Sequence, residues 1–219
     1  MNKIKLLYDV ARVMREKEAW NGAINISGVK DDAEAFHFDN EFSRDLVSGT
    51  SKARISSVVD HGGRRIKHES TTEFNGHQDQ GHGRREGKAH RFFHHHHGHH
   101  ACGSGWGVKE KLDRLMAVLG ALNDMQVVEQ ADKSLLLSLD LKNIPESMLA
   151  RFHEKMPPEH LGHRGFLQGT PAMESGSLEC RINPKYEVET VKVNIKGKLQ
   201  CENDQSQDWT LNASLSFAW

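Results

Sequence analysis

The segment WTLNASLSFAW, residues 209–219, alternates apolar and polar side chains more regularly than any other part of the chain. Side chains of a β-strand point alternately to the two sides of a sheet. This pattern therefore predicts a strand with one buried and one solvated face. Two further segments show the same period of two, AFHFDNEF at 35–42 and SLLLSLDL at 134–141. The sequence thus predicts a mainly antiparallel β protein.

Other strands and three helices account for most of the remaining chain. Apolar residues recur at helical spacing over 2–17 and 108–122, and Asn143-Ile144-Pro145-Glu146 resembles the start of a helix that ends near Met156. Short connections between successive strands favour hairpins. We therefore expect an α+β fold, a curved antiparallel half-barrel of about nine strands packed around two to three helices. The further strands are predicted around 20–26, 53–59, 64–74, 125–130, 178–182 and 191–199.

Residues 76–103 break the alternation with GHQDQGHGRREGKAHRFFHHHHGHHACG. Such a segment cannot bury enough apolar surface to offset the entropy lost on ordering, so we predict a disordered histidine- and glycine-rich insert. A second mobile loop is expected at 157–172. Residues 1–219 are otherwise expected to form a single domain.

Composition excludes several classes of partner. The net charge is −1, so no global field favours nucleic acid or an anionic membrane. No segment approaches the roughly 18 apolar residues of a membrane span, and the N-terminal segment lacks the apolar core of a secretory signal. The three cysteines, Cys102, Cys180 and Cys201, are too sparse for a disulfide framework. We therefore expect a cytoplasmic protein with reduced thiols.

The insert holds nine of the fifteen histidines and is the main candidate for metal binding. Neutral imidazole suits Zn, Ni, Cu and Co, and a neighbouring cysteine thiolate can join it. We expect a transition metal, Ni or Zn first, although a low-complexity loop could also bind such ions only adventitiously. Loop histidines at 160 and 163 would add ligands if the two loops lie close together. The candidate ligands are His90, His94, His95, His96, His97, His99, His100, Cys102, His160 and His163.

A second candidate site lies on the strand predicted at 64–74. His68, Ser70 and Thr72 fall on its inner face by alternation. They would be the polar groups of an apolar pocket, although a histidine in such a position is more often part of the core. The chain shows neither a Gly-x-Ser-x-Gly elbow nor an HExxH motif. We therefore expect a non-enzymatic binding protein.

The order of the elements and the segments AFHFDNEF, SLLLSLDL and WTLNASLSFAW resemble the half-barrel of bacterial lipoprotein carriers. The resemblance covers the whole chain except the insert. It implies a curved sheet around helices with an apolar cavity. The protein would then be a carrier or partner-binding module whose concave face takes a hydrophobic small molecule or a protein partner.

Overall fold

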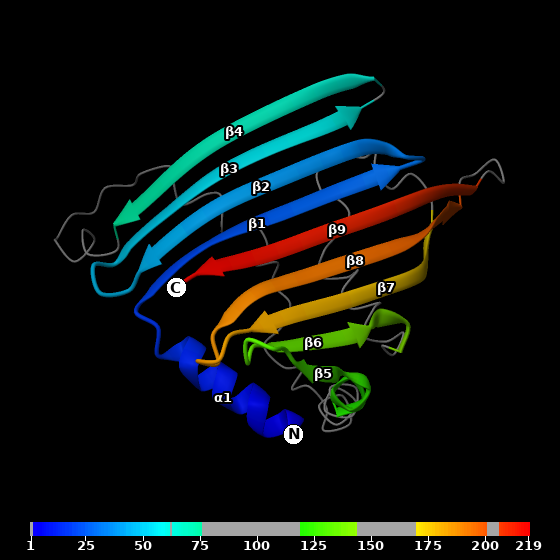
Figure 1. The fold of residues 1–219 in the computed structure, drawn as a ribbon. Coiled ribbons are helices and arrows are strands. Elements are labelled where there is room, and N and C mark those ends of the chain that lie inside the picture. The colour runs from blue at the N-terminus through cyan, green and yellow to red at the C-terminus, as the bar shows by residue number, and fades with distance from the viewer. Residues whose placement is uncertain (1, 62, 76–118, 144–169, 201–205) are drawn as a thin grey trace, which may run out of the picture.

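The computed structural model describes residues 2–61, 63–75, 119–143, 170–200 and 206–219. Nine strands form one antiparallel sheet in the order β4-β3-β2-β1-β9-β8-β7-β6-β5 (Figure 1). The sheet is open, because β4 and β5 end it without pairing with each other. The predicted nine-stranded antiparallel sheet is confirmed. The strands are β1 (Ala19–Lys30), β2 (Ala33–Asp45), β3 (Thr50–His61), β4 (Arg64–Asn75), β5 (Gln126–Glu129), β6 (Leu135–Asp140), β7 (Thr170–Ile182), β8 (Val188–Gln200) and β9 (Ser206–Ala218).

The hairpin turns within the described residues contain local hydrogen bonds. In the β3–β4 turn the backbone N–H of Gly63 donates to the carboxylate of Asp60 at 3.0 Å. Gly63 has φ +78°, a conformation that favours glycine because other residues carry a Cβ. The tight turn predicted after Val59 is therefore confirmed.

The start of β7 corrects one boundary. Residues 170–172 were expected to end a mobile loop, but β7 begins at Thr170, which lies opposite Gln200 of β8. Pro171 cannot donate a ladder hydrogen bond, yet it lies opposite Leu199 within the same pairing. Pairing with β8 thus extends the strand through Pro171, a residue type that in the sequence alone favours a loop.

The pairing of β1 with β9 joins the two halves of the sheet. Ten residues of β1, Asn21 to Lys30, lie opposite Ala218 to Trp209 of β9. β9 also pairs with β8, from Ser206 to Ser216. The C-terminal strand is therefore central, and its partners lie on both sides of it (Figure 1).

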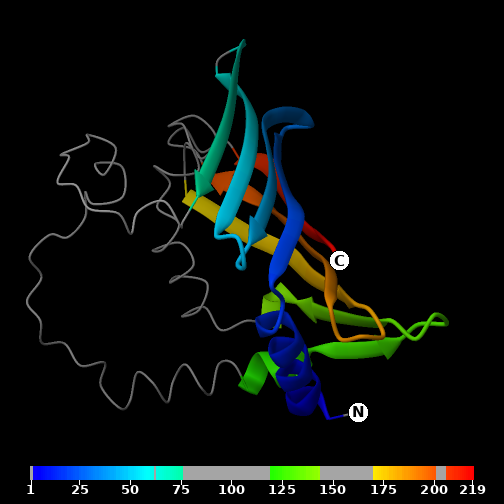
Figure 2. The same ribbon diagram turned by 90° about the vertical axis from the view of Figure 1, so that its left-hand side faces the viewer.

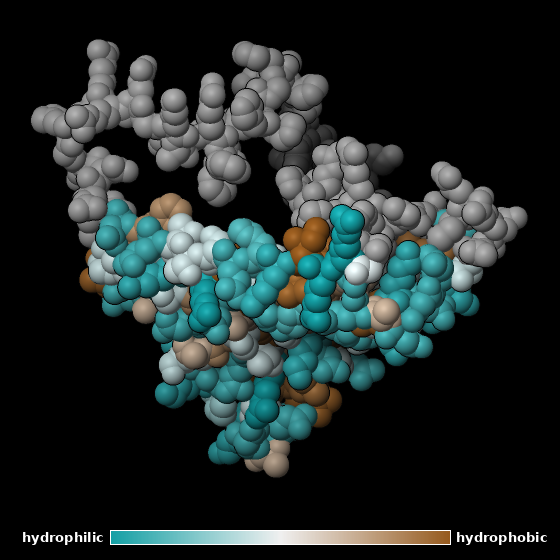
Figure 3. Space-filling view, turned by 90° about the horizontal axis from the view of Figure 1, so that it is seen from above, coloured by the Kyte–Doolittle hydropathy of each residue, from teal (hydrophilic) through white to brown (hydrophobic). Residues whose placement is uncertain are grey.

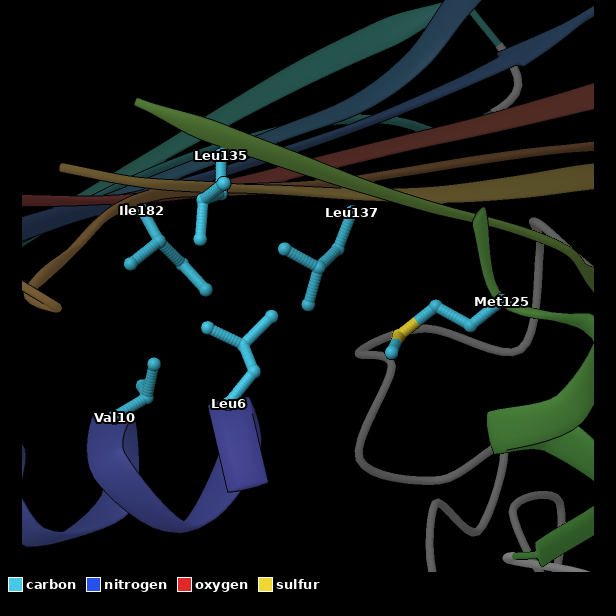
Figure 4. Close-up of a cluster of buried hydrophobic side chains, with 6 residues drawn as sticks. All are labelled: Leu6, Val10, Met125, Leu135, Leu137 and Ile182. Atoms are coloured by element: carbon cyan, nitrogen blue, oxygen red, sulfur yellow. The ribbon is translucent and has the colours of Figure 1, made fainter. Parts of the chain in front are cut away.

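Helix α1 (Lys3–Arg15) covers one end of the sheet, beside β5 and β6 (Figure 2). The side-chain oxygen of Asn2 accepts from the backbone N–H groups of Ile4 and Lys5, which caps the helix. The helix predicted at 2–17 is therefore confirmed. Its apolar stripe points at the sheet (Figure 4). The buried cluster there consists of Leu6, Val10, Met125, Leu135, Leu137 and Ile182.

A buried carboxylate ties the end of α1 to the β7–β8 turn. Glu187 is only 7% exposed and pairs with the ammonium of Lys17. It also accepts a hydrogen bond from the Asn183 amide at 2.6 Å. The Lys17 and Asn183 hydrogen bonds hold the pKa of Glu187 below its usual value, because they favour the charged form. Lys17 also lies 4.8 Å from the ring centre of Trp219.

Several predictions fall outside the described residues. The insert at 76–103 does, as do residues 157–169 of the second loop and nearly all of the helix expected from Asn143 to Met156. Of the helix expected at 108–122, only the C-terminal part is described, and residues 119–124 are helical. None of the described helices is long and apolar enough to cross a membrane.

Ending the chain at Asp208 should abolish cooperative folding. The truncation removes most of a central strand, including Trp209, which is 9% exposed. Losing one large buried side chain costs about 2–5 kcal/mol, against a domain stability of about 5–15 kcal/mol. Near-UV circular dichroism during heating measures the loss. A melting transition like that of the full chain would contradict the central role of β9.

Candidate ligand-binding face

One face of the sheet is mainly apolar from β6 to β2, and on β3 and β4 it also carries Ser57, His68, Ser70 and Thr72. Directly opposed residues of antiparallel neighbours project to the same side, so the pairing register assigns the faces. One row runs from β6 to β2 through six side chains that are all apolar: Leu139, Leu178, Val193, Ala213, Ile26 and Phe38. The adjacent row consists of Leu137, Cys180, Val191, Leu215, Ile24, Asn40, Ile55 and Ser70.

Large side chains on this face lie over glycines of neighbouring strands. A Cβ added at Gly22 would be 2.6 Å from the ring of Phe42 and 2.5 Å from the carbonyl oxygen of Ser216. A Cβ added at Gly197 would collide with the Ala172 carbonyl and lie 2.9 Å from Nε1 of Trp209. Both glycines therefore provide the space that an aromatic ring fills.

Aromatic rings close one end of the face. Phe217 contacts Trp20 and Phe42 edge to face, with ring centres 5.8 and 6.1 Å apart. Trp219 stacks on Phe217 at 5.2 Å. Its indole N–H donates to the Val188 carbonyl at 2.8 Å, so this polar group is paired. The ring cluster extends the apolar face to the tip of β9.

The opposite face is polar and carries two shallow hollows. They have volumes of about 620 and 230 Å³ and share Ser177, Glu179 and Asn194. Beside the smaller hollow, Asn25 donates to Asp39 at 2.6 Å, and His37 lies 2.8 Å from the same carboxylate. Hydroxyl, amide and charged groups of this kind are well solvated on a sheet surface. The hollows therefore need no ligand to satisfy their polar groups.

Two buried polar atoms on the apolar face lack a hydrogen-bond partner in the part of the chain that the structure describes. They are Oδ1 of Asn40 and Nε1 of Trp209. Trp209 is 9% exposed and Asn40 is half-buried. A buried group without a partner costs about 1–3 kcal/mol, and native proteins retain few of them. These two atoms mark the apolar face as the candidate site.

Sequence reasoning missed both atoms for different reasons. Asn40 belongs to the alternating series Phe36, Phe38, Asn40 and Phe42, so the period of two already places it among apolar residues. That signal was present in AFHFDNEF. Trp209 was predicted to be buried, but whether its N–H finds a partner depends on residues far away in the sequence.

The predicted pocket residues lie on the edge strand β4. The register places His68, Ser70 and Thr72 on the apolar face, opposite Ser57, Ile55 and Ala53. His68 is exposed, so it is not a core histidine, while Ser70 and Thr72 are half-buried. These three residues share a face, but none of them lines the two hollows of the opposite face or the hollow beside Lys17 and Trp219.

The predicted metal ligands all lie outside the described residues, from His90 to Cys102 and at His160 and His163. Within the described ranges, no group of three His, Cys, Asp or Glu side chains could hold a metal ion. Cys180 is half-buried and free, and burial raises the pKa of its thiol, so it stays neutral. The sequence matches no protein-family model and no curated protein.

Replacing Gly197 with Ala should destabilise the protein by about 1–3 kcal/mol, the usual cost of overpacking. The added methyl group meets backbone at Ala172 and cannot be accommodated by a rotamer change. Denaturant unfolding measures the effect. Gly120→Ala is the matched control, because a Cβ there meets no atom of the described residues within 4 Å. Since Gly120 is helical, the control should stabilise slightly. Equal stability of the two variants would show that the face tolerates extra volume at Gly197.

Proposed function

We propose that this chain is a non-enzymatic binding protein and that its apolar face carries a hydrophobic small molecule. The observation that carries the proposal is a pair of buried atoms on that face, Oδ1 of Asn40 and Nε1 of Trp209, for which the described ranges supply no hydrogen-bond partner. An apolar site with a few placed polar groups is the usual design of a small-molecule pocket. The resemblance to half-barrel lipoprotein carriers supports the same function.

The two polar atoms define the chemistry of the ligand. The Trp209 indole N–H donates only, so it needs an acceptor, whereas the Asn40 oxygen accepts and needs a donor. Asn40 of β2 lies in the same cross-strand row as Leu215 of β9, two strands away. Leu215 is six residues from Trp209 along β9. From strand geometry the two groups are about 20 Å apart along the strands and about 10 Å apart across them. A ligand that meets both is therefore elongated, apolar in the middle and polar at its ends.

A long-chain ω-hydroxy fatty acid has this pattern, because its carboxylate accepts and its hydroxyl donates. We expect Asn40→Leu to weaken its binding about three- to tenfold while leaving a plain fatty acid of equal length unaffected. Trp209→Phe should weaken both ligands by a similar factor, because it removes the donor and keeps the apolar ring. Titration calorimetry measures the affinity of each of the two variants for each of the two fatty acids.

The preference for the hydroxylated ligand, and not stability, separates a binding role from a packing defect. Asn40→Leu removes an unpaired buried oxygen, so the free protein should gain about 1–3 kcal/mol whichever role holds. Trp219→Phe is the control, because its N–H is already paired within the chain. It should lower stability and leave ligand affinity unchanged. If neither fatty acid binds, or if Asn40→Leu stabilises without altering the preference for the hydroxyl, the carrier proposal fails.

A second proposal rests on composition. The segment 90–102 contains seven histidines and Cys102, and we propose that it binds Ni²⁺, Zn²⁺, Co²⁺ or Cu²⁺ as a metal buffer or sensor. Side chains of an extended segment alternate, so His94–His97 would supply about two ligands to one ion. His99, His100 or Cys102 would complete the set, with His160 and His163 as further donors. A carrier scaffold and a metal-loading segment are compatible in one chain.

Metal binding should weaken steeply as pH falls through about 6.5, the ordinary histidine pKa, because only neutral imidazole is a ligand. Titration calorimetry of protein purified without a metal column measures it at pH 7.5 and 5.5, on either side of this pKa. His94–His97 changed together to Ala should lose most of the affinity. His153→Ala, a histidine outside the segment, is the control. Equal binding by both variants and the parent chain would leave the segment without a metal role.

A further inference from the structure

We propose that two copies of this chain pair through their β4 edges, so that the two sheets become one. β4 is twelve residues long, and ten of them are exposed. Among the described residues it pairs only with β3. The outer backbone N–H and C=O groups of such an edge are ready to bond a further strand.

The two ends of the sheet differ in how they are protected. β5, the opposite edge, has only four residues. β4 has neither of the usual structural blocks, since its twelve pairs with β3 show no register shift and its sequence RRIKHESTTEFN contains no proline. Proteins generally shorten, bend or interrupt strands that must stay unpaired. β4 therefore retains the geometry of a pairing edge.

The side chains of β4 complement each other when a second β4 runs antiparallel to it. In the register that places Ser70 opposite its own copy, Ile66 lies opposite Phe74. These are exposed apolar residues of the strand, 50% and 62% exposed. On the other face, the same register places Lys67 opposite Glu73. Each pair occurs twice because a two-fold axis relates the copies. A shift by one residue on each strand would instead place Glu69 opposite itself.

The charges of β4 also have a simpler role, since lysines on an edge discourage aggregation. Within one chain Lys67 pairs with Glu69 at 2.7 Å and Glu73 with Lys52 at 3.1 Å. All four side chains are more than half exposed, so these pairs are weak and can exchange partners at little cost. Figure 3 looks down on this edge, where hydrophilic residues predominate and apolar ones show in separate patches. Such a surface fits a reversible dimer better than an obligate one.

Sedimentation of the full chain tests the proposal directly. The monomer has a mass of 24.7 kDa, so pairing should raise the weight-average mass towards twice that value as concentration rises from about 1 µM to about 1 mM. A constant monomer mass over this range would overturn it. It would also show that the charges of β4 only keep the edge unpaired.

Charge reversal tests the register. Lys67→Glu places two glutamates opposite each other twice per dimer and should raise the dissociation constant about tenfold or more. Lys67→Glu with Glu73→Lys restores opposite charges and should restore the dimer. Lys192→Glu, an exposed change on the same face in the central strand β8, is the control and should have no effect. If Lys67→Glu leaves the dissociation constant of the dimer unchanged, the interface lies elsewhere.

Crosslinking gives an independent measurement that does not depend on charge. With Cys102, Cys180 and Cys201 changed to Ser, Ser70→Cys should form a disulfide between copies under mild oxidation. Directly opposed residues place their Cβ atoms about 4.5–5.5 Å apart, within a small adjustment of disulfide geometry. Thr72→Cys is the matched control, because its own copy would lie about 13 Å away along the strand. Equal crosslinking of both variants, or of neither, would contradict the proposed register.

Discussion

The pairing of β1 with β9 is the constraint on which the rest of the structure depends. It joins residues almost the whole chain apart, and no other described pairing connects the β4–β1 half of the sheet with the β9–β5 half. A slip of one residue would turn every side chain of one half to the other face. At its far end, Asp31 and Asp208 exchange backbone and side-chain hydrogen bonds at 3.0 and 3.2 Å, which holds the register. The continuous apolar face is a product of this one ladder.

Local features of the sequence were sufficient to predict the elements, but not how they are arranged. Alternation and capping act over a few residues, so α1, the nine strands and the turn at Asp60 could be predicted. The Lys17–Glu187 pair spans 170 positions, and no local signal links them. The same holds for Trp209, whose packing over Gly197 depends on strand order. For the candidate site, alternation could have identified Asn40, whereas the lack of a partner for either atom could be seen only in the folded chain.

The apolar face is not equally buried along its length. Its β5–β7 end packs against α1 and holds a buried cluster that includes Ile182, 1% exposed, and Leu137, 3% exposed. Leu199 of β8 is also fully buried but lies outside this cluster. The unpartnered atoms of Asn40 and Trp209 lie away from that cluster. Each costs about 1–3 kcal/mol in the free protein, a sizeable share of a stability of about 5–15 kcal/mol. Native proteins retain few such atoms, and for this reason we propose a ligand on this face.

The uneven burial of the sheet also determines where binding of a ligand or partner stabilises the protein most. Regions with few buried contacts and exposed strands open at lower free energy than the core. β4 is the most exposed strand and lies farthest in the sheet from the α1 cluster. Anything that binds only the folded form of a region increases the stability of that region. A ligand near Asn40 on β2 and a second copy at β4 would both stabilise the folded state of this outer half, so each would make the other site more often available.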